Sequence, residues 1–377
     1  MENVNRDTFL QLARVLKHRT VSSAETDVSP GLLHEFGIDK PLLLVLVDGL
    51  GESYLERLPS SSFLRQCRES TLESVFPSTT ACALTTLATG LPPATHGIPG
   101  RYAYIPNGDT QVNTLAFRER FDGSLLSPDY PLTALWPYPS TIPGMSVPTY
   151  TIIPEVLRHT PFETYLCGST PIGGYDTVEH AVDLAREALD RSGPGRAFYY
   201  LYIWDLDSLG HRAGTADEGI DLLLNTLDRE LNRLWDSVKG KADMVITADH
   251  GQIDAADPVF ITPGHPLSTY LETAPYGEPR AAQLRVKTDR ANEFSGFFRE
   301  TLGDRFDLHV MEDTAGMFGA SGFSEFAREN FGNYLAVAIG RNLMIYTPGD
   351  PEKARVNRGE HGGGLPEERL VPLIIPR

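Results

Sequence analysis

With 377 residues, 41% of them hydrophobic and 22% charged, the chain is long enough for a large core and too apolar for wholesale disorder. Its formal net charge of −17 argues against a nucleic-acid polymer or an anionic membrane as a partner, but it is compatible with a small phosphorylated substrate held near dications. Three cysteines without CxxC spacing, no apolar signal core near Met1 and no run of membrane-spanning length predict a soluble cytoplasmic protein.

The first segments predict a helix on the surface of the core, followed by a buried strand. Residues 8–15 have the apolar spacing of a short amphipathic helix, and a loop rich in Ser, Pro and Gly follows up to residue 40. Leu42–Val47 is a buried strand that ends at Asp48, where Gly49 permits a tight turn. Two more elements are expected next: a helix over Ser53–Glu69, interrupted near Pro59, and a strand over Thr71–Phe76.

A helix is predicted over Ala81–Thr89, with hydroxyl side chains before it and Gly90 after it. Hydroxyls at a helix start usually cap the helix. Because a helix N-terminus also attracts phosphate, Thr79 or Thr80 has a second interpretation as a nucleophile. The motif alone does not decide between the two roles.

The middle of the chain predicts a long loop and then a series of regular elements. Gly97–Pro154 is rich in Pro, Gly and Tyr, and we expect it to cross the top of a sheet and line a substrate pocket. The elements expected after it are a strand over Pro161–Gly168, a helix over Thr177–Arg191, a strand over Phe198–Trp204 and an apolar-striped helix over Asp217–Val238.

Carboxylates and imidazoles follow three of the predicted buried strands. Asp48 follows the first, Asp207 and His211 follow Phe198–Trp204, and Asp249 and His250 follow the strand Met244–Ala248. The carboxyl ends of parallel strands form the edge where ligands bind in open α/β sheets, and the i, i+4 spacing of Asp207 and His211 places both on one helical face. Mixed Asp and His ligands favour zinc, with manganese or iron as alternatives. The candidate metal ligands are Asp48, Asp207, His211, Asp249, His250 and His361.

The pattern changes after residue 263, which predicts an inserted α+β lid. Its expected elements are strands over Ala281–Val286, Asp307–Met311 and Tyr334–Tyr346 and a helix over Asn292–Leu302. We therefore expect a core over residues 41–263, a lid over residues 264–347 and a return to the core over residues 348–377. The return segment carries His361 and a final strand, Leu370–Ile375, while residues 1–40 pack on the core as a helix and a loop.

These motifs, in this order, resemble the alkaline phosphatase superfamily, and within it the type I phosphodiesterase/nucleotide pyrophosphatase branch. The resemblance implies an α/β three-layer sandwich with a central, mostly parallel sheet and an inserted α+β lid. It also implies that Asp48, Asp249, His250 and the nucleophile share one metal ion, and that a second metal ion is held elsewhere. The ligands implied for that second ion are Asp207, His211 and His361. The resembling pieces are Val47-Asp48-Gly49, Pro77–Thr80 through Thr89–Ile98, Asp207–His211, Thr247–Gly251 and Glu360–Gly363.

The same resemblance implies a threonine nucleophile. When the family's Pro-Thr-Lys-Thr motif is placed without gaps on Pro77–Gly90, the attacking residue falls at Thr80, with Thr79 as the alternative. Arg101 stands where the family has a phosphate-contacting Asn, so it is either a phosphate clamp or a surface arginine. We expect His96 to bind backbone in a turn and Cys82 to pack in the core.

We therefore expect a two-metal hydrolase of phosphoric esters or anhydrides, a phosphodiesterase or nucleotide pyrophosphatase that forms a phosphothreonine intermediate. A phosphomonoesterase, a phosphonate hydrolase and a phosphomutase are alternatives within the superfamily. The sulfatase pattern Cys-x-Pro-x-Arg is absent. An inactive phospho-ligand-binding protein is an alternative of another class. The predicted cofactors are two divalent ions, and the sequence predicts no oligomeric state.

Overall fold

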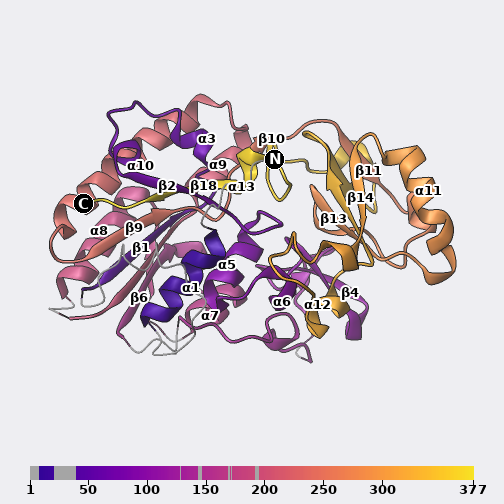
Figure 1. Ribbon diagram of the computed structural model, residues 1–377, viewed down its shortest axis with the longest axis horizontal. Coiled ribbons are helices and arrows are strands. Elements are labelled where there is room, and N and C mark those ends of the chain that lie inside the picture. Colours follow the sequence, from indigo (N-terminus) through magenta and orange to yellow (C-terminus); the bar gives the residue numbers. More distant parts are fainter. Residues whose placement is uncertain are drawn as a thin grey trace.

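The computed structural model describes residues 8–20, 40–127, 129–142, 147–168, 170, 172–191 and 195–377. One of its two lobes is built on a seven-stranded sheet (Figure 1). Five neighbouring strands run parallel, and β18 runs antiparallel between β2 and β9. The strands across this sheet are β2 (Arg68–Glu73), β18 (Leu370–Ile374), β9 (Asp243–Thr247), β1 (Leu42–Val47), β8 (Phe198–Ile203), β6 (Thr149–Pro154) and β7 (Ile172–Tyr175).

Helices cover both faces of this sheet, so the predicted three-layer α/β sandwich is confirmed (Figure 1). The helices on one face are α1 (Phe9–Thr20), α5 (Thr80–Thr89) and α7 (Pro161–Cys167). Those on the other face are α3 (Glu52–Leu55), α4 (Phe63–Gln66), α8 (Val178–Arg191), α9 (Asp205–Ala213) and α10 (Glu218–Val238). The central strands β1 and β8 are buried along their whole length, as expected of parallel strands that are covered on both faces.

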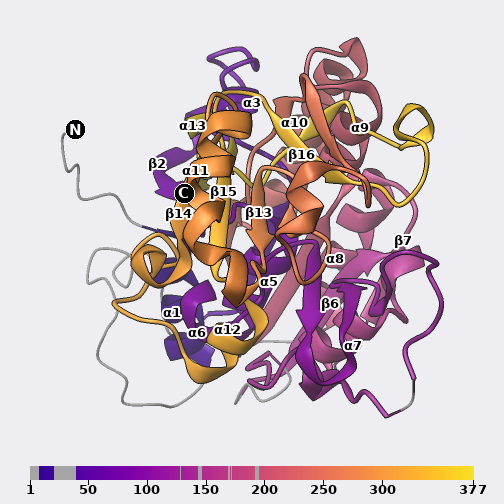
Figure 2. The same ribbon diagram turned by 90° about the vertical axis from the view of Figure 1, so that its right-hand side faces the viewer.

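The other lobe holds a second, antiparallel sheet of seven strands, which Figure 2 shows from its outer side behind α11 (Ala291–Leu302). Phe294 and Phe298 of α11 are fully buried in the core that this helix forms with the sheet. The strands across it are β14 (Phe306–Val310), β15 (Tyr334–Ala338), β13 (Ala281–Leu284), β12 (Tyr276–Glu278), β3 (Tyr102–Ile105), β4 (Thr110–Asn113) and β5 (Arg118–Glu119). Three of these strands, β3 to β5, come from the segment Gly97–Pro154, which was expected to be a loop.

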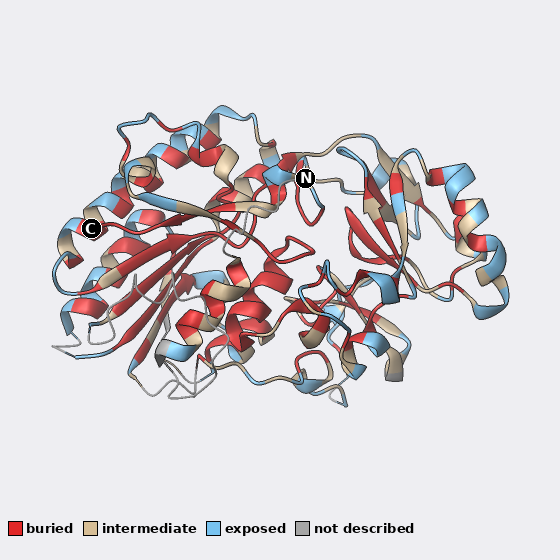
Figure 3. Cartoon of the chain, in the orientation of Figure 1, coloured by how far each residue is buried: buried red, intermediate tan, exposed pale blue. Residues whose placement is uncertain are grey.

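Two short strand pairs and three short helices complete the strands and α-helices of the described residues. The pair β10 (Ile253–Asp254) and β17 (Gly359–Glu360) brings the chain after β9 beside the chain before His361. The remaining elements are β11 (Pro258–Ile261) with β16 (Leu343–Tyr346), and the helices α6 (Pro93–His96), α12 (Glu325–Asn330) and α13 (Pro366–Arg369). Figure 3 shows that buried residues concentrate in the strands of both sheets and on the inner sides of the helices.

Some sequence-based predictions of individual elements were wrong. Pro161–Gly168 is a helix rather than a strand, because the Thr160 side chain accepts a hydrogen bond from Glu163 N and Pro161 occupies the first turn. The helix expected over Ser53–Glu69 is reduced to α3 and α4, and the following strand, β2, begins earlier than predicted, at Arg68.

The structure places the N-terminal helix but not the loop that was predicted to follow it. Helix α1 packs against α5, while residues 21–39 of the expected loop lie outside the described residues. The division of the chain at residues 263 and 347 stays a prediction. Among the described helices, none combines the length and the apolar character that crossing a bilayer requires.

Candidate active site

The candidate site lies at the carboxyl edge of the three central strands, β9, β1 and β8, of the mostly parallel sheet. Asp48 directly follows β1, and Asp249 and His250 follow β9. Helix α9 begins just beyond β8 and carries Asp207 in its first turn and His211 in its last. The topology thus brings together the strand ends that the sequence singled out.

Thr80, Asp48 and His250 meet at one side of the site. Thr80 Oγ1 lies 3.1 Å from His250 Nε2 and 3.4 Å from Asp48 Oδ2. His250 Nε2 also lies 3.3 Å from Asp48 Oδ1 and 3.5 Å from Asp249 Oδ2. All four side chains are buried, so their polar atoms face one another rather than bulk water.

Asp207, His211 and His361 form the other side of the site. His211 Nε2 lies 3.3 Å from Asp207 Oδ2, and His361 Nε2 lies 3.8 Å from Asp207 Oδ1. One ligand-type atom from each of the three lies within 4.8 Å of the others, a spacing that suits a single metal ion. The rings of His250 and His361 stack at 3.7 Å between centroids, which joins the two sides into one cluster.

Backbone carbonyl groups orient the three imidazoles. Nδ1 of His211 lies 2.7 Å from Gly359 O, Nδ1 of His250 lies 3.0 Å from Gly251 O, and Nδ1 of His361 lies 3.1 Å from the carbonyl oxygen of Ser78. A ring that donates from Nδ1 keeps the Nε2 lone pair free. In each of the three residues it is Nε2 that faces the cluster, which is the arrangement found for histidine ligands of metals.

The cluster holds more negative charge than its own residues can balance. Burial, together with the neighbouring carboxylates, raises the pKa of Asp48 and Asp207 well above the usual range, and burial raises the pKa of Asp249 to about 6. Burial also lowers the pKa values of His250 and His361, so these imidazoles are neutral near pH 7.

Two buried carboxylate oxygens of this cluster are available to bind a cation. Within the described part of the chain, Asp48 Oδ1 and Asp249 Oδ2 have no hydrogen-bond partner. Bound dications would supply both the partners and the charge, so these residues fit the metal ions that the sequence predicts.

The grouping of the carboxylates differs in one respect from the resemblance-based assignment. The second set of ligand-type atoms that fall within 4.8 Å of one another comes from Asp48, Asp207 and His250, without Asp249. Asp207 thus borders both sides of the cluster. The assignment of Asp249 to one particular ion stays a prediction.

Two glycines allow the strand ends to come this close. Gly49 has φ +78°, and a Cβ added there would lie 3.1 Å from the Cβ of Asp207. A Cβ on Gly251 would collide with the carbonyl oxygen of Glu367. A residue larger than glycine at position 49 would push the end of β1 away from Asp207, and one at position 251 would push the segment after β9 away from Glu367.

The structure separates the two threonines that the sequence could not distinguish. Thr80 points into the cluster, whereas Thr79 Oγ1 donates a 2.7 Å hydrogen bond to Glu278 Oε1 of the second lobe. Thr79 is the N-cap residue of α5 but makes no side-chain capping hydrogen bond, so the expected capping role is not observed. Glu278 was missed by the sequence analysis, because no local pattern links it to residues about 200 positions earlier.

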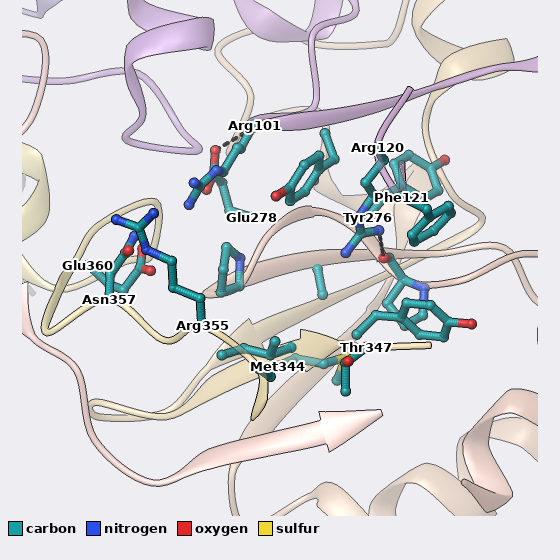
Figure 4. Close-up of a pocket in the computed structure, with 18 of the residues that line it drawn as sticks. Arg101, Arg120, Phe121, Tyr276, Glu278, Met344, Thr347, Arg355, Asn357 and Glu360 are labelled. Atoms are coloured by element: carbon teal, nitrogen blue, oxygen red, sulfur yellow. Dashed lines mark hydrogen bonds between the residues drawn. The ribbon is translucent and has the colours of Figure 1, made fainter. Parts of the chain in front are cut away.

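A cavity of about 520 Å³ opens beside this cluster, between α9 and the strands of the second lobe (Figure 4). Arg101 borders it, and its backbone N–H donates a 2.5 Å hydrogen bond to Glu278 Oε1. Burial raises the pKa of Glu278 to about 7. Arg120, Phe121, Tyr346 and Arg355 also line the cavity, and none of them carried a motif in the sequence.

Two further residues behave as the sequence suggested and lie outside the cluster. His96 Nδ1 accepts a 3.2 Å hydrogen bond from Ile98 N, and its Nε2 lies 3.1 Å from Thr86 Oγ1. Cys82 is fully buried and donates to the backbone oxygen of Ile98.

The sandwich fold, with a carboxylate and imidazole cluster at its strand ends, is that of the alkaline phosphatase superfamily. The sequence profile of the type I phosphodiesterase/nucleotide pyrophosphatase family matches residues 42–296, and the chain belongs to this family. The match extends from the first core strand into α11, so it includes all the candidate site residues except His361.

Known proteins of this family resemble the chain in sequence and in structure. Venom phosphodiesterase CdcPDE of Crotalus durissus collilineatus is 28% identical over 258 residues, which are 63% of this chain and 28% of the venom protein. Ectonucleotide pyrophosphatase/phosphodiesterase family member 3 of Mus musculus is 26% identical over 251 residues, which are 61% of this chain and 26% of the mouse protein. The matches thus span little more than a quarter of these relatives. The solved structure of human ectonucleotide pyrophosphatase/phosphodiesterase 5 has the same fold, with a TM-score of 0.67, 17% identity and coverage of 89% of this chain and 87% of the human one.

Proposed function

We propose that the protein is a metal-dependent phosphodiesterase or nucleotide pyrophosphatase that hydrolyses phosphoric esters or anhydrides through a phosphothreonine intermediate at Thr80. Family membership and the chemistry of the ligand cluster support this proposal. The observation that carries it is the position of Thr80 Oγ1, 3.1 Å from His250 Nε2 and 3.4 Å from Asp48 Oδ2 at the start of α5.

In the proposed reaction, Thr80 Oγ1 attacks phosphorus and the bond to one ester oxygen breaks, so that an alcohol or phosphate leaves with its electron pair. Water then attacks the phosphothreonine, which releases the phosphorylated product and restores the hydroxyl. The N–H groups at the start of α5 face the charge that develops on the phosphoryl oxygens. Two dications, when bound, would lower the pKa of the hydroxyl and of water and stabilise that charge.

The residues proposed to hold these ions are Asp48, Asp249, His250 and Thr80 for one, and Asp207, His211 and His361 for the other. The mixed oxygen and nitrogen donors favour zinc over magnesium or calcium, with manganese or iron as alternatives. Neighbouring groups orient the carboxylates. Gln252 Nε2 donates a 2.8 Å hydrogen bond to Asp207 Oδ1, and the Tyr202 hydroxyl donates to Asp48 Oδ2.

The proposed substrate is a small phosphorylated molecule. Murine ectonucleotide pyrophosphatase/phosphodiesterase 5, which shares this fold, has been solved as an inactive variant in complex with AMP. In this chain, Arg101 lines the cavity beside the cluster of carboxylates and imidazoles. We assign it the role of binding a non-bridging phosphoryl oxygen. A cytoplasmic location is part of the proposal, since Cys67, Cys82 and Cys167 are all free thiols.

Turnover of bis(4-nitrophenyl) phosphate by zinc-loaded protein tests the proposed function. Hydrolysis that is faster than that of 4-nitrophenyl phosphate is expected for a diesterase. The reverse order would make the protein a monoesterase of the same superfamily, and no turnover of any phosphate ester at any metal loading would contradict the proposal. Subcellular fractionation of the native host tests the proposed location.

A further inference from the structure

The cavity beside the metal-ligand cluster differs in charge from the protein as a whole. The chain carries a formal net charge of −17, yet four arginines and two glutamates border this cavity. Arg101, Arg212 and Arg355 lie near the cluster end, together with Glu360. Arg120 lies on the side formed by the second lobe, and Figure 4 shows its side chain reaching toward the cavity from beside Phe121 and Tyr276.

Neutral groups hold Arg120 in place. Its Nη1 donates 2.5 Å hydrogen bonds to Gln111 Oε1 and to the carbonyl oxygen of Pro275. Gln111 is itself buried and anchored, because its Nε2 donates to Thr273 Oγ1 at 3.0 Å and to Ala274 O at 2.6 Å. This network fixes the position of the guanidinium group but adds no negative charge to balance it.

The charge of Arg120 has no counter-ion in the described structure. Among the described residues it forms no ion pair with a carboxylate, and its side-chain hydrogen bonds are the two from Nη1 to uncharged oxygens. Burial lowers the pKa of Arg120 to about 10, so the group stays protonated at neutral pH. A held guanidinium with one edge unused is the geometry that binds carboxylate and phosphate in a bidentate manner.

The aromatic rings around Arg120 are already engaged. The guanidinium carbon lies 4.2 Å from the centroid of the Tyr102 ring and 5.2 Å from that of Phe121. Phe121 in turn packs edge-on against Tyr346, with 5.6 Å between centroids and an interplanar angle of 63°. These contacts further fix Arg120 and occupy the ring of Tyr102, so an anion suits this end of the cavity better than a planar base does.

We propose that the cavity receives one ester group of the substrate and that Arg120 binds a second anionic group on it. The substrate class is then a phosphoric diester or anhydride in which the bound ester group carries a carboxylate, phosphate or sulfate. This inference rests on the proposed function, because the phosphoryl group that reacts is placed at Thr80. Both arginines lie on the cavity wall. Arg101 contacts the reacting phosphoryl group, and Arg120 binds the second anionic group.

The test uses pairs of 4-nitrophenyl diesters over a series of chain lengths. In each pair, one compound is a 4-nitrophenyl alkyl phosphate and the other is the 4-nitrophenyl ω-carboxyalkyl phosphate of the same chain length. Wild-type protein is expected to prefer the carboxylate at one length by about tenfold or more in kcat/KM, since a charge-assisted bidentate pair contributes at least that factor. Arg120→Gln is expected to lose this preference. Arg120→Lys, which keeps the charge, is expected to retain part of it.

Arg118→Gln is the matched control, because Arg118 belongs to the short strand just before Arg120 and is exposed, and among the described residues its side chain hydrogen-bonds only to Gly123 O. It is expected to keep the full preference. No preference at any chain length, or a preference that Arg120→Gln retains, would overturn the proposal.

A binding measurement separates this inference from the proposed function. If no phosphodiester is turned over, the proposed function fails, and calorimetry on the zinc-loaded protein then tests the subsite with alkyl and ω-carboxyalkyl phosphates. Tighter binding of the carboxylates in wild type but not in Arg120→Gln supports the subsite. Equal binding of both series refutes it.

Discussion

Arg280 and Glu368 form a fully buried, bidentate ion pair that joins the second lobe to the segment carrying His361. Arg280 Nε lies 2.6 Å from Glu368 Oε1, and Nη2 lies 2.9 Å from Glu368 Oε2. Two more guanidinium hydrogens reach Asn342 O and Gly340 O, while Glu368 also accepts from Gly363 N at 2.8 Å. The lobe that forms the cavity wall is therefore tied directly to the loop of His361, a candidate metal ligand.

Removal of one partner of this pair should be costly. Arg280→Met leaves the Glu368 carboxylate buried without a cation, so we expect the free energy of unfolding to fall by about 3–5 kcal/mol. The double variant Arg280→Met/Glu368→Gln should recover part of this loss. Urea denaturation measures it, and Arg191→Met, in an exposed pair with Glu187, is the control, with a change of no more than about 0.5 kcal/mol. A loss in the control equal to that of Arg280→Met would remove the special role of the buried pair.

Substitutions at the two threonines should have unequal effects on turnover. Thr80→Ala removes the proposed nucleophile, so we expect a barrier increase of several kcal/mol and no phosphorylated peptide after acid quenching. Thr80→Ser should keep most of the activity. Thr79→Ala only removes a hydrogen bond to Glu278, so its turnover should change far less. Activity is compared at matched metal content. An active Thr80→Ala beside an inactive Thr79→Ala would move the nucleophile by one residue, and activity in both would contradict the covalent mechanism.

The metal content should respond to single ligands. Gently purified wild-type protein should contain about two zinc or other transition dications per chain, and His361→Ala should contain about one. Elemental analysis measures both. The control is His96→Gln, because His96 is buried away from the cluster and bonds Thr86 and Ile98. Magnesium or calcium alone in the wild type would contradict the zinc assignment.

Stability should depend on pH through Glu163, which lies in the core beside Cys167. Burial raises the pKa of Glu163 from the ordinary value of 4.5 to about 7, and its carboxylate accepts only a weak hydrogen bond from Cys167 Sγ at 3.5 Å. The folded protein therefore binds a proton more tightly than the unfolded chain, so the associated stability is complete below pH 4.5 and is lost as the pH rises through about 7.

Glu163→Gln should remove this dependence. The free energy of unfolding of the variant minus that of wild type should increase by on the order of 2–3 kcal/mol between about pH 4 and pH 8. Urea denaturation at both pH values measures this difference, with the exposed Glu187→Gln as control. A difference that stays constant with pH would show that folding does not raise the pKa of Glu163.

The site residues that could be predicted are those that lie next to a recognisable local sequence pattern. A short, continuous apolar run such as Leu42–Val47, bounded by polar residues and glycine, favours a buried strand, and a carboxylate that follows such a strand lies at the sheet edge, so the positions of Asp48 and Asp249 were predicted without a structure. Glu278 and Arg120 could not be found in this way. They reach the site through pairing of β12 with β3 and of β4 with β5, contacts between distant segments that leave no local pattern.

Short segments were the other source of error. The Pro161–Gly168 run was too short for periodicity to separate strand from helix, and a single cap at Thr160 decided the outcome. The tyrosine-rich segment after Gly97 was interpreted as a loop because its strands, β3 to β5, contain only two to four residues each.

The position of β18 in the mostly parallel sheet has a consequence for the nascent chain during synthesis. β18 lies between β2 and β9, although it follows every other described element in sequence. A nascent chain that has emerged only through β9 therefore exposes one unpaired edge of that strand, and it also lacks His361. Such an edge is a template for pairing with other chains until β18 covers it. Closure of the sheet and completion of the candidate ligand set thus both depend on the segment that carries His361 and β18.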